Sequence, residues 1–130
     1  MKIKPGGQRI VRVQGRDGRG PWRPGFSHRW VFDREDIETL PPWMEDFGGD
    51  VVGIAARQGP KFGAYFGCGC RTVEQLRRWF VLEEYETLKR FGYSAVEIIA
   101  DRIIAENERQ LVFQRKKPLA IEAVEFELYP

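Results

Sequence analysis

Alternating hydrophobic and polar positions predict strands in the first and last parts of the chain. Residues Arg9–Gln14 alternate in this way, so Val11 and Val13 share one face of a first strand. Four later stretches have strand-like composition and alternation: Tyr93–Ile99, Asp101–Ala105, Gln110–Arg115 and Ile121–Tyr129. The second of them either extends the first or forms a strand of its own. The last is expected to turn Val124, Phe126 and Leu128 inward.

The middle of the chain has hydrophobic residues at helical spacing. Thr72 is expected to cap a helix whose buried face includes Leu76, with Gln75 completing a capping box. A second helix is predicted over Glu83–Phe91 and should end at Gly92, because glycine is common just after a helix. Helices therefore separate the first strand from the later ones.

The stretches before Thr72 are less regular. Asp33 can cap a short helix that runs to about Leu40, where two prolines end it. Trp43–Phe47 fits one further helical turn, and Val51–Ala56 fits either a short strand or a piece of helix. Gly63–Phe66 is predicted to end a strand.

Glycines 67 and 69 are expected in the turn that follows this strand end, where a side chain would obstruct close approach or a positive φ. The whole pattern predicts one α+β domain over residues 1–130. It should have a mainly antiparallel sheet and two or three helices in the middle of the chain.

Length and composition agree with a folded domain. The chain has 130 residues, of which 42% are hydrophobic and 13% aromatic. No apolar run approaches the roughly 20 residues of a membrane span, and no secretory or lipidation signal is visible. We expect a cytoplasmic protein with no membrane partner, and a flexible arm over residues 1–8.

Charge is unevenly distributed although the net charge is only +2. Residues 1–30 carry eight basic residues and one acid, Asp17, whereas residues 31–130 carry thirteen basic residues and eighteen acids. The front of the chain is therefore suited to meeting an anion, or it serves as a solubilising arm.

Residues 15–30 form a glycine- and proline-rich segment that is too irregular for a helix or a strand. Its arginines can grip phosphate and its aromatic residues can stack on a base, although the glycine spacing is not that of a known phosphate loop. The alternative is a loop that packs its aromatic side chains over the sheet. The candidate ligand-binding residues are Arg12, Arg16, Arg19, Trp22, Ser27, His28 and, on the later strand, Tyr65.

The only cysteines are Cys68 and Cys70, separated by one glycine. This spacing rarely gives an unstrained disulfide and supplies no second pair of zinc ligands. With one histidine far away in the sequence, we expect no metal site. Two reduced thiols are the favoured interpretation, although the following helix start leaves thiol chemistry open.

Three pieces of the chain resemble small proteins of phages and bacterial mobile elements: Gly18-Arg-Gly-Pro-Trp22, the segment Phe66–Phe80, and Gln110-Leu-Val-Phe113. The order of elements is also similar to the mono-ADP-ribosyltransferase pattern. That resemblance implies an NAD cofactor held by Arg12. It also implies a catalytic Glu-x-Glu turn made of Glu106 and Glu108, of which Glu108 would stabilise an oxocarbenium-like ribose. The segment Tyr65–Cys70 departs from the family's serine-threonine-serine motif.

Two hypotheses follow from these features. In the first, the protein is an ADP-ribosyltransferase-like domain that binds NAD or a related nucleotide beside the basic, aromatic loop. This hypothesis includes the possibility of an NAD-dependent enzyme. In the second, it is a non-catalytic phage protein that inhibits a host protein through this loop. Contact with nucleic acid is also possible and is less favoured, because the rest of the chain is acidic.

Overall fold

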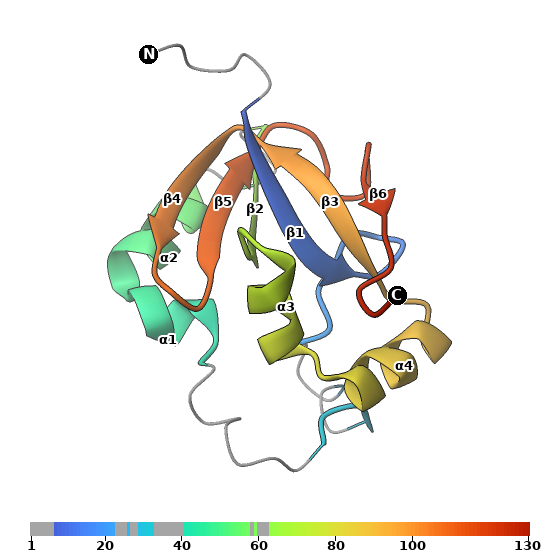
Figure 1. Ribbon diagram of the computed structural model, residues 1–130. Helices are drawn as coiled ribbons and strands as arrows, with labels where there is room; N and C mark the ends of the chain where they lie inside the picture. Colours follow the sequence, from blue (N-terminus) through green and yellow to red (C-terminus); the bar gives the residue numbers. More distant parts are fainter. Residues whose placement is uncertain (1–6, 23–25, 27–28, 33–40, 58, 60–62) are drawn as a thin grey trace.

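The computed structural model describes residues 7–22, 26, 29–32, 41–57, 59 and 63–130. The helix predicted from Asp33 to Leu40 lies outside these residues, and so does most of the expected N-terminal arm. The described residues contain six strands and four helices, which confirms the predicted α+β class (Figure 1).

The strands form two antiparallel sheets of three strands each. One sheet has the order β1 (Gln8–Gln14), β3 (Ser94–Ala100), β6 (Val124–Glu125), and the other has the order β2 (Tyr65–Gly69), β5 (Leu111–Arg115), β4 (Arg102–Glu106). Val11 and Cys70 join the sheets by exchanging two backbone hydrogen bonds of 3.0 and 2.8 Å. Strands β1 and β2 are therefore neighbours at the centre of the fold (Figure 1).

The helices connect β1 to β2 and β2 to β3. They are α1 (Trp43–Phe47), α2 (Gly49–Arg57), α3 (Val73–Trp79) and α4 (Leu82–Arg90). The predicted capping box of Thr72 and Gln75 is confirmed, and Gly92 follows α4 with a φ of 90°. The ambiguous stretch Val51–Ala56 is helical. Within the described part of the chain, every helix is too short or too polar to cross a membrane.

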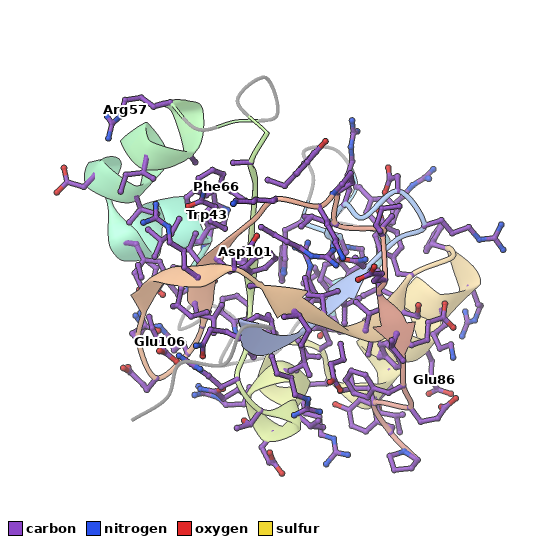
Figure 2. The ribbon with its side chains drawn as sticks, turned by 90° about the horizontal axis from the view of Figure 1, so that it is seen from above. Trp43, Arg57, Phe66, Glu86, Asp101 and Glu106 are labelled. Atoms are coloured by element: carbon purple, nitrogen blue, oxygen red, sulfur yellow. The ribbon has the colours of Figure 1, made fainter. Side chains whose placement is uncertain are left out.

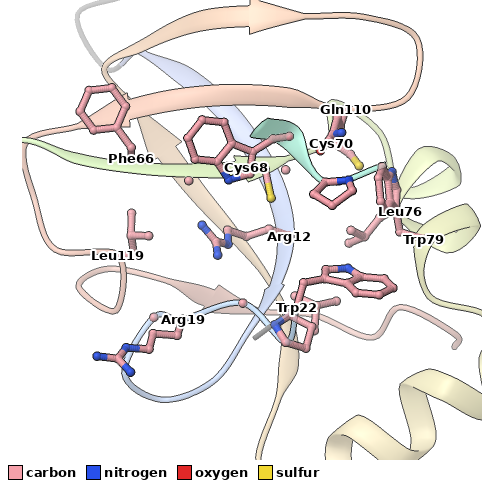
Figure 3. Close-up of a pocket in the computed structure, with 18 of the residues that line it drawn as sticks. Arg12, Arg19, Trp22, Phe66, Cys68, Cys70, Leu76, Trp79, Gln110 and Leu119 are labelled. Atoms are coloured by element: carbon pink, nitrogen blue, oxygen red, sulfur yellow. The ribbon is translucent and has the colours of Figure 1, made fainter. Parts of the chain in front are cut away.

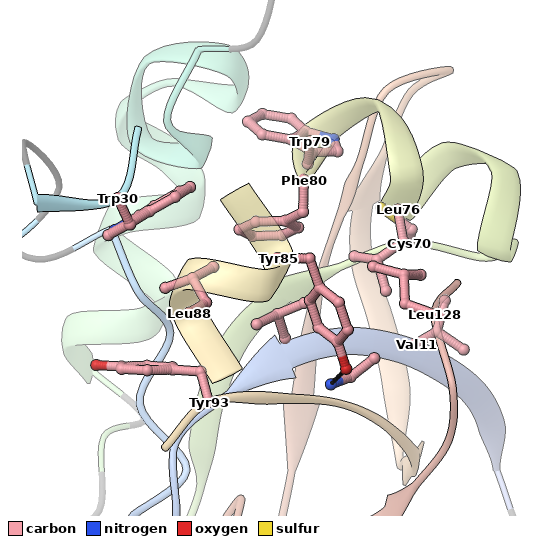
Figure 4. Packing of buried hydrophobic residues seen from close by; sticks show 12 residues of the cluster. Val11, Trp30, Cys70, Leu76, Trp79, Phe80, Tyr85, Leu88, Tyr93 and Leu128 are labelled. Atoms are coloured by element: carbon pink, nitrogen blue, oxygen red, sulfur yellow. Dashed lines mark hydrogen bonds between the residues drawn. The ribbon is translucent and has the colours of Figure 1, made fainter. Parts of the chain in front are cut away.

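Two hydrophobic clusters lie on opposite faces of β1. Val11 and Val13 share a face, as predicted, and pack with residues of α3 and α4 such as Leu76 and Leu88 (Figure 4). Ile10 points the other way and packs against Phe113 between the two sheets. Because both faces are covered, β1 is a buried central strand, and Arg12 on it is buried as well.

The prediction of a long final strand is wrong. Only Val124–Glu125 pair with β3, and Val124 is 64% exposed instead of facing inward. The buried Arg115 explains the difference, because its guanidinium donates to the carbonyl oxygens of Pro118 and Ile121 and holds the chain in a loop. Leu128 is buried, as predicted.

The expected turn at glycines 67 and 69 is also wrong. Both residues lie within β2, opposite Phe113 and Leu111 of β5. The sequence suggested that these glycines allow either a close approach of neighbouring groups or a positive φ. The close approach of β1 to β2 is what requires glycine here. A Cβ at Gly69 would lie 2.6 Å from Ile10 Cγ2 and 2.9 Å from the carbonyl oxygen of Val11. Strand β2 can therefore lie this close to β1 only because Gly69 has no side chain.

Candidate functional site

A cavity of about 520 Å³ lies where β1 and β2 meet (Figure 3). This volume falls in the range of about 300–1,000 Å³ that is typical of small-molecule sites. Strand β2 forms one wall, and residues 17–22, 42–43 and 118–119 and the end of α3 form the others. Most of the lining is apolar, and it includes the aromatic residues Trp22, Trp43, Tyr65, Phe66, Trp79 and Phe80. Figure 2 shows Trp43 and Phe66 at the same side of the molecule.

Arg12 is the buried cation of this cavity. Its side chain extends from β1 between Cys68 and Trp22 (Figure 3), and the residue is only 6% exposed. Its Nε and Nη1 atoms are buried and have no hydrogen-bond partner among the described residues. The ring of Phe113 lies 5.6 Å from Cζ and supplies a cation–π contact. The guanidinium is therefore short of polar partners among the described residues.

Burial lowers the pKa of the Arg12 guanidinium, and the neighbouring Cys68 opposes this shift. An arginine nevertheless keeps its charge in proteins, because its ordinary pKa lies far above neutrality. The cavity thus holds a fixed positive charge in a low-dielectric environment, where an anion is attracted more strongly than in water.

Glycines make room for this side chain. A Cβ at Gly67 would overlap Arg12 Nη1 and would lie 2.9 Å from Phe113 Cζ. A Cβ at Gly20 would lie 3.3 Å from Arg12 Nη2. Glycines 20 and 67 therefore flank the guanidinium from the loop and from β2, and neither position has a positive φ to explain it.

Both thiols are held in the neutral form. Burial raises the pKa of Cys68, although the charge of Arg12 partly offsets the effect. Burial raises the pKa of Cys70 to about 12, and its Sγ donates to the carbonyl oxygen of Arg109 at 3.8 Å. Neither cysteine is a thiolate near neutral pH, which argues against thiol chemistry in this cavity.

Gln110 lines the cavity at the end near Cys70 and Trp79 (Figure 3). Its Nε2 donates to the carbonyl oxygen of Pro41 and to Asp46 Oδ2, each at 2.9 Å. The sequence indicated Gln110 only as the start of a strand. The hydrogen bond that positions its side chain is accepted by Asp46 of α1, which lies 64 positions earlier in the chain.

Asp46 is the anchor of this polar cluster, and its side chain is only 4% exposed. It accepts hydrogen bonds from Asn107, Arg109 and Gln110. Burial by itself would raise the pKa of Asp46, but these hydrogen bonds outweigh it and hold the pKa below its usual value. Asp46 is therefore ionised and acts only as an acceptor. Sequence reasoning gave no role to this residue.

The structure places four of the predicted binding residues on the cavity: Arg12, Arg19, Trp22 and Tyr65. Arg16 is exposed and is not part of the lining. The predicted binding residues Ser27 and His28 lie outside the described residues. Arg19 lies at the rim, where its side chain is 72% exposed and pairs with Asp17 at 3.7 Å.

The two glutamates suggested as catalytic residues do not line the cavity. Glu106 ends β4 and pairs with Arg71 on the surface, and Figure 2 shows it apart from Trp43 and Phe66. Glu108 is 77% exposed and pairs with Arg109. The geometry that the ADP-ribosyltransferase resemblance requires, Arg12 and Glu108 facing one pocket, is absent from the described residues. The turn is occupied by surface ion pairs instead.

Residues 1–127 match the model of the family described as "Bacteriophage T4 Y00F protein". No curated protein and no solved structure matches the chain.

Proposed function

We propose that this phage protein, which belongs to the bacteriophage T4 Y00F protein family, binds NAD or a related nucleotide, such as ADP-ribose, around Arg12. The observation that carries the proposal is the buried guanidinium, two of whose nitrogens lack a partner in the part of the chain that the structure describes. Buried polar groups without partners are rare in folded proteins and cost free energy. A ligand anion near Arg12 would compensate the buried charge.

The other walls of the cavity favour an aromatic group in the same ligand. Trp22, Trp43 and Phe66 offer ring surface, and stacking on such rings is how proteins commonly hold a base. A phosphate and a base together make a nucleotide. The volume of about 520 Å³ accommodates a ligand of this class at least in part.

We propose binding without cleavage of the glycosidic bond. Cleavage of NAD passes through an oxocarbenium-like state that a nearby carboxylate stabilises. Asp17 is the one carboxylate among the described lining residues, and Arg19 already engages it through an ion pair and a backbone hydrogen bond. A protein of this kind would hold its nucleotide in the host cytoplasm and so withdraw it from other uses.

Thermal unfolding of the purified protein with and without NAD or ADP-ribose tests the proposal. A ligand present at about 100 times its Kd stabilises a folded protein by about 2.7 kcal/mol, so a clear rise in Tm is expected. Arg12→Met should remove about half of this rise or more, whereas Arg90→Met, which changes an exposed arginine at the end of α4, should preserve it. No rise with either nucleotide would refute the proposal.

Turnover is measured in the same samples. Incubation with NAD should release no nicotinamide above the rate without protein. Release of nicotinamide that Glu108→Gln abolishes would restore the enzymatic hypothesis and overturn the proposal of binding without cleavage.

A second candidate function is the binding of a host protein, and a cluster of exposed apolar side chains around α4 favours it. Leu82 begins this helix, Phe91 caps its end, and the backbone N–H of Phe32 donates to Glu84 at 2.9 Å. The side chains of Leu82, Phe91 and Phe32 remain partly exposed. Aromatic residues and arginines of this kind are typical of interface hot spots.

Affinity capture from host lysate at increasing salt concentration tests the second candidate. Arg29, whose guanidinium lies 6.0 Å from the ring of Phe91, belongs to the same surface. Arg29→Glu combined with Phe91→Ser should abolish capture of a partner, while Arg12→Met should leave it intact. Failure to capture any host component at low salt would count against this function.

A further inference from the structure

The amide of Gln110 has a fixed orientation in the cavity. Its two Nε2 hydrogens point to a backbone carbonyl, that of Pro41, and to the carboxylate of Asp46. Both groups are acceptors only, since Asp46 is ionised. A flipped amide would place Oε1 against two acceptors and lose both hydrogen bonds, so the flip is strongly disfavoured.

Oε1 is consequently the polar atom that Gln110 can offer to a ligand. Among the described residues no donor is hydrogen-bonded to it, although Gln110 is buried and lines the cavity. The neighbouring lining residues at this end, Cys70 and Trp79, both donate to the carbonyl oxygen of Arg109. The end of the cavity near Gln110 therefore presents an unengaged acceptor.

We infer that Gln110 selects a nucleotide whose base presents an N–H donor, such as the amino group of adenine or the carboxamide of nicotinamide. This inference rests on the nucleotide binding proposed above. Arg12 supplies the charge that attracts the phosphate, and Gln110 supplies an acceptor that reads the base. A ring with a carboxylate at that position would face Oε1 with the wrong polarity and would lie near the negative charge of Asp46.

Pairs of ligands that differ in one donor test the inference by calorimetric titration. NAD is compared with its deamido analogue, which carries a carboxylate in place of the carboxamide. ADP-ribose is compared with the counterpart whose adenine is replaced by purine, which lacks the amino group. The member with the donor should bind about tenfold or more tightly in at least one pair, since the other member would cover Oε1 without offering it a hydrogen bond.

Asp46→Asn provides the matching protein variant. An asparagine amide can donate to Oε1 as well as accept from Nε2, so the orientation of Gln110 is no longer fixed. The preference within the ligand pair should fall to about threefold or less, while binding through Arg12 persists. A variant that had simply lost its structure would bind neither ligand, and its Tm would reveal this.

The outcomes separate the inference from the proposed function. If the two members of both pairs bind equally well to the unchanged protein, the role of Gln110 is refuted and nucleotide binding stands. If neither NAD nor ADP-ribose binds, the proposed function fails and the inference fails with it. A preference that survives in Asp46→Asn would refute the role of Asp46 in fixing the amide, because the carbonyl oxygen of Pro41 would then be sufficient to hold it.

Discussion

Replacement of Arg12 by methionine should change stability and ligand binding in opposite directions. Methionine matches the unbranched stem of arginine and removes the charge and the donors. In the ligand-free protein it removes a buried guanidinium whose Nε and Nη1 have no hydrogen-bond partner within the described residues. Most substitutions at a buried position destabilise a protein, so a rise in stability here would be diagnostic.

The magnitude follows from the contacts of Arg12. Replacing a buried ion pair by apolar groups of similar volume is often neutral or stabilises a fold by about 1–4 kcal/mol, and the incompletely paired guanidinium of Arg12 is expected to follow the same trend. Loss of the cation–π contact with Phe113, at 5.6 Å, costs about 0.5–2 kcal/mol. The net expectation is a gain of about 1 kcal/mol, which raises the Tm of a domain of this size by about 3–6 °C.

Binding should respond in the other direction. A hydrogen bond to a charged group contributes about 1.5–3 kcal/mol, so the variant should bind its nucleotide about ten to one hundred times more weakly. Thermal and chemical unfolding measure the first effect, and calorimetric titration with NAD or ADP-ribose measures the second. Arg90→Met is the control, with an expected change in stability of about 0.5 kcal/mol or less.

A lower Tm for Arg12→Met together with unchanged affinity would refute this reasoning. It would mean that the guanidinium has a stabilising partner in the free protein and no part in binding. A Tm that rises with unchanged affinity would refute only the assignment of Arg12 to the ligand.

Three further outcomes are expected. Gly67→Ala should destabilise the fold by about 1–3 kcal/mol and weaken nucleotide binding, because the added methyl group overlaps the guanidinium of Arg12; urea unfolding and titration measure both. Leu88→Ala, at a fully buried position of α4, should cost about 2–5 kcal/mol without changing affinity in the protein that remains folded. The carboxylate of Asp46 has a lowered pKa in the folded protein, so its contribution to stability is present above its usual value of 3.8 and is lost as the pH falls further. Asp46→Asn should therefore flatten the stability profile below about pH 4, and an unchanged profile would count against the hydrogen-bond assignment.

Local sequence pattern was sufficient for much of the secondary structure. Alternation along Arg9–Gln14 depends on the geometry of a strand alone, and it correctly placed Val11 and Val13 on one face. The capping box at Thr72 and the glycine after α4 were predictable for the same reason, because each involves residues within one turn of helix. The structure of the end of the chain was not predictable in this way, since the loop that shortens the last strand depends on the buried Arg115.

The cavity depended on contacts between distant parts of the chain. The sequence by itself determined that an arginine lies on the first strand among apolar neighbours and that a basic, aromatic segment follows it. Only the tertiary structure decided that Arg12 is buried without sufficient partners, since this requires β2, with glycine at 67, to pass beside it. Gln110 became a candidate for base recognition only because Asp46 of α1 fixes its amide. Glu106 and Glu108 match the Glu-x-Glu pattern of a catalytic turn in sequence. Burial and ion pairing are properties of the folded chain, however, and the fold leaves both glutamates in surface ion pairs.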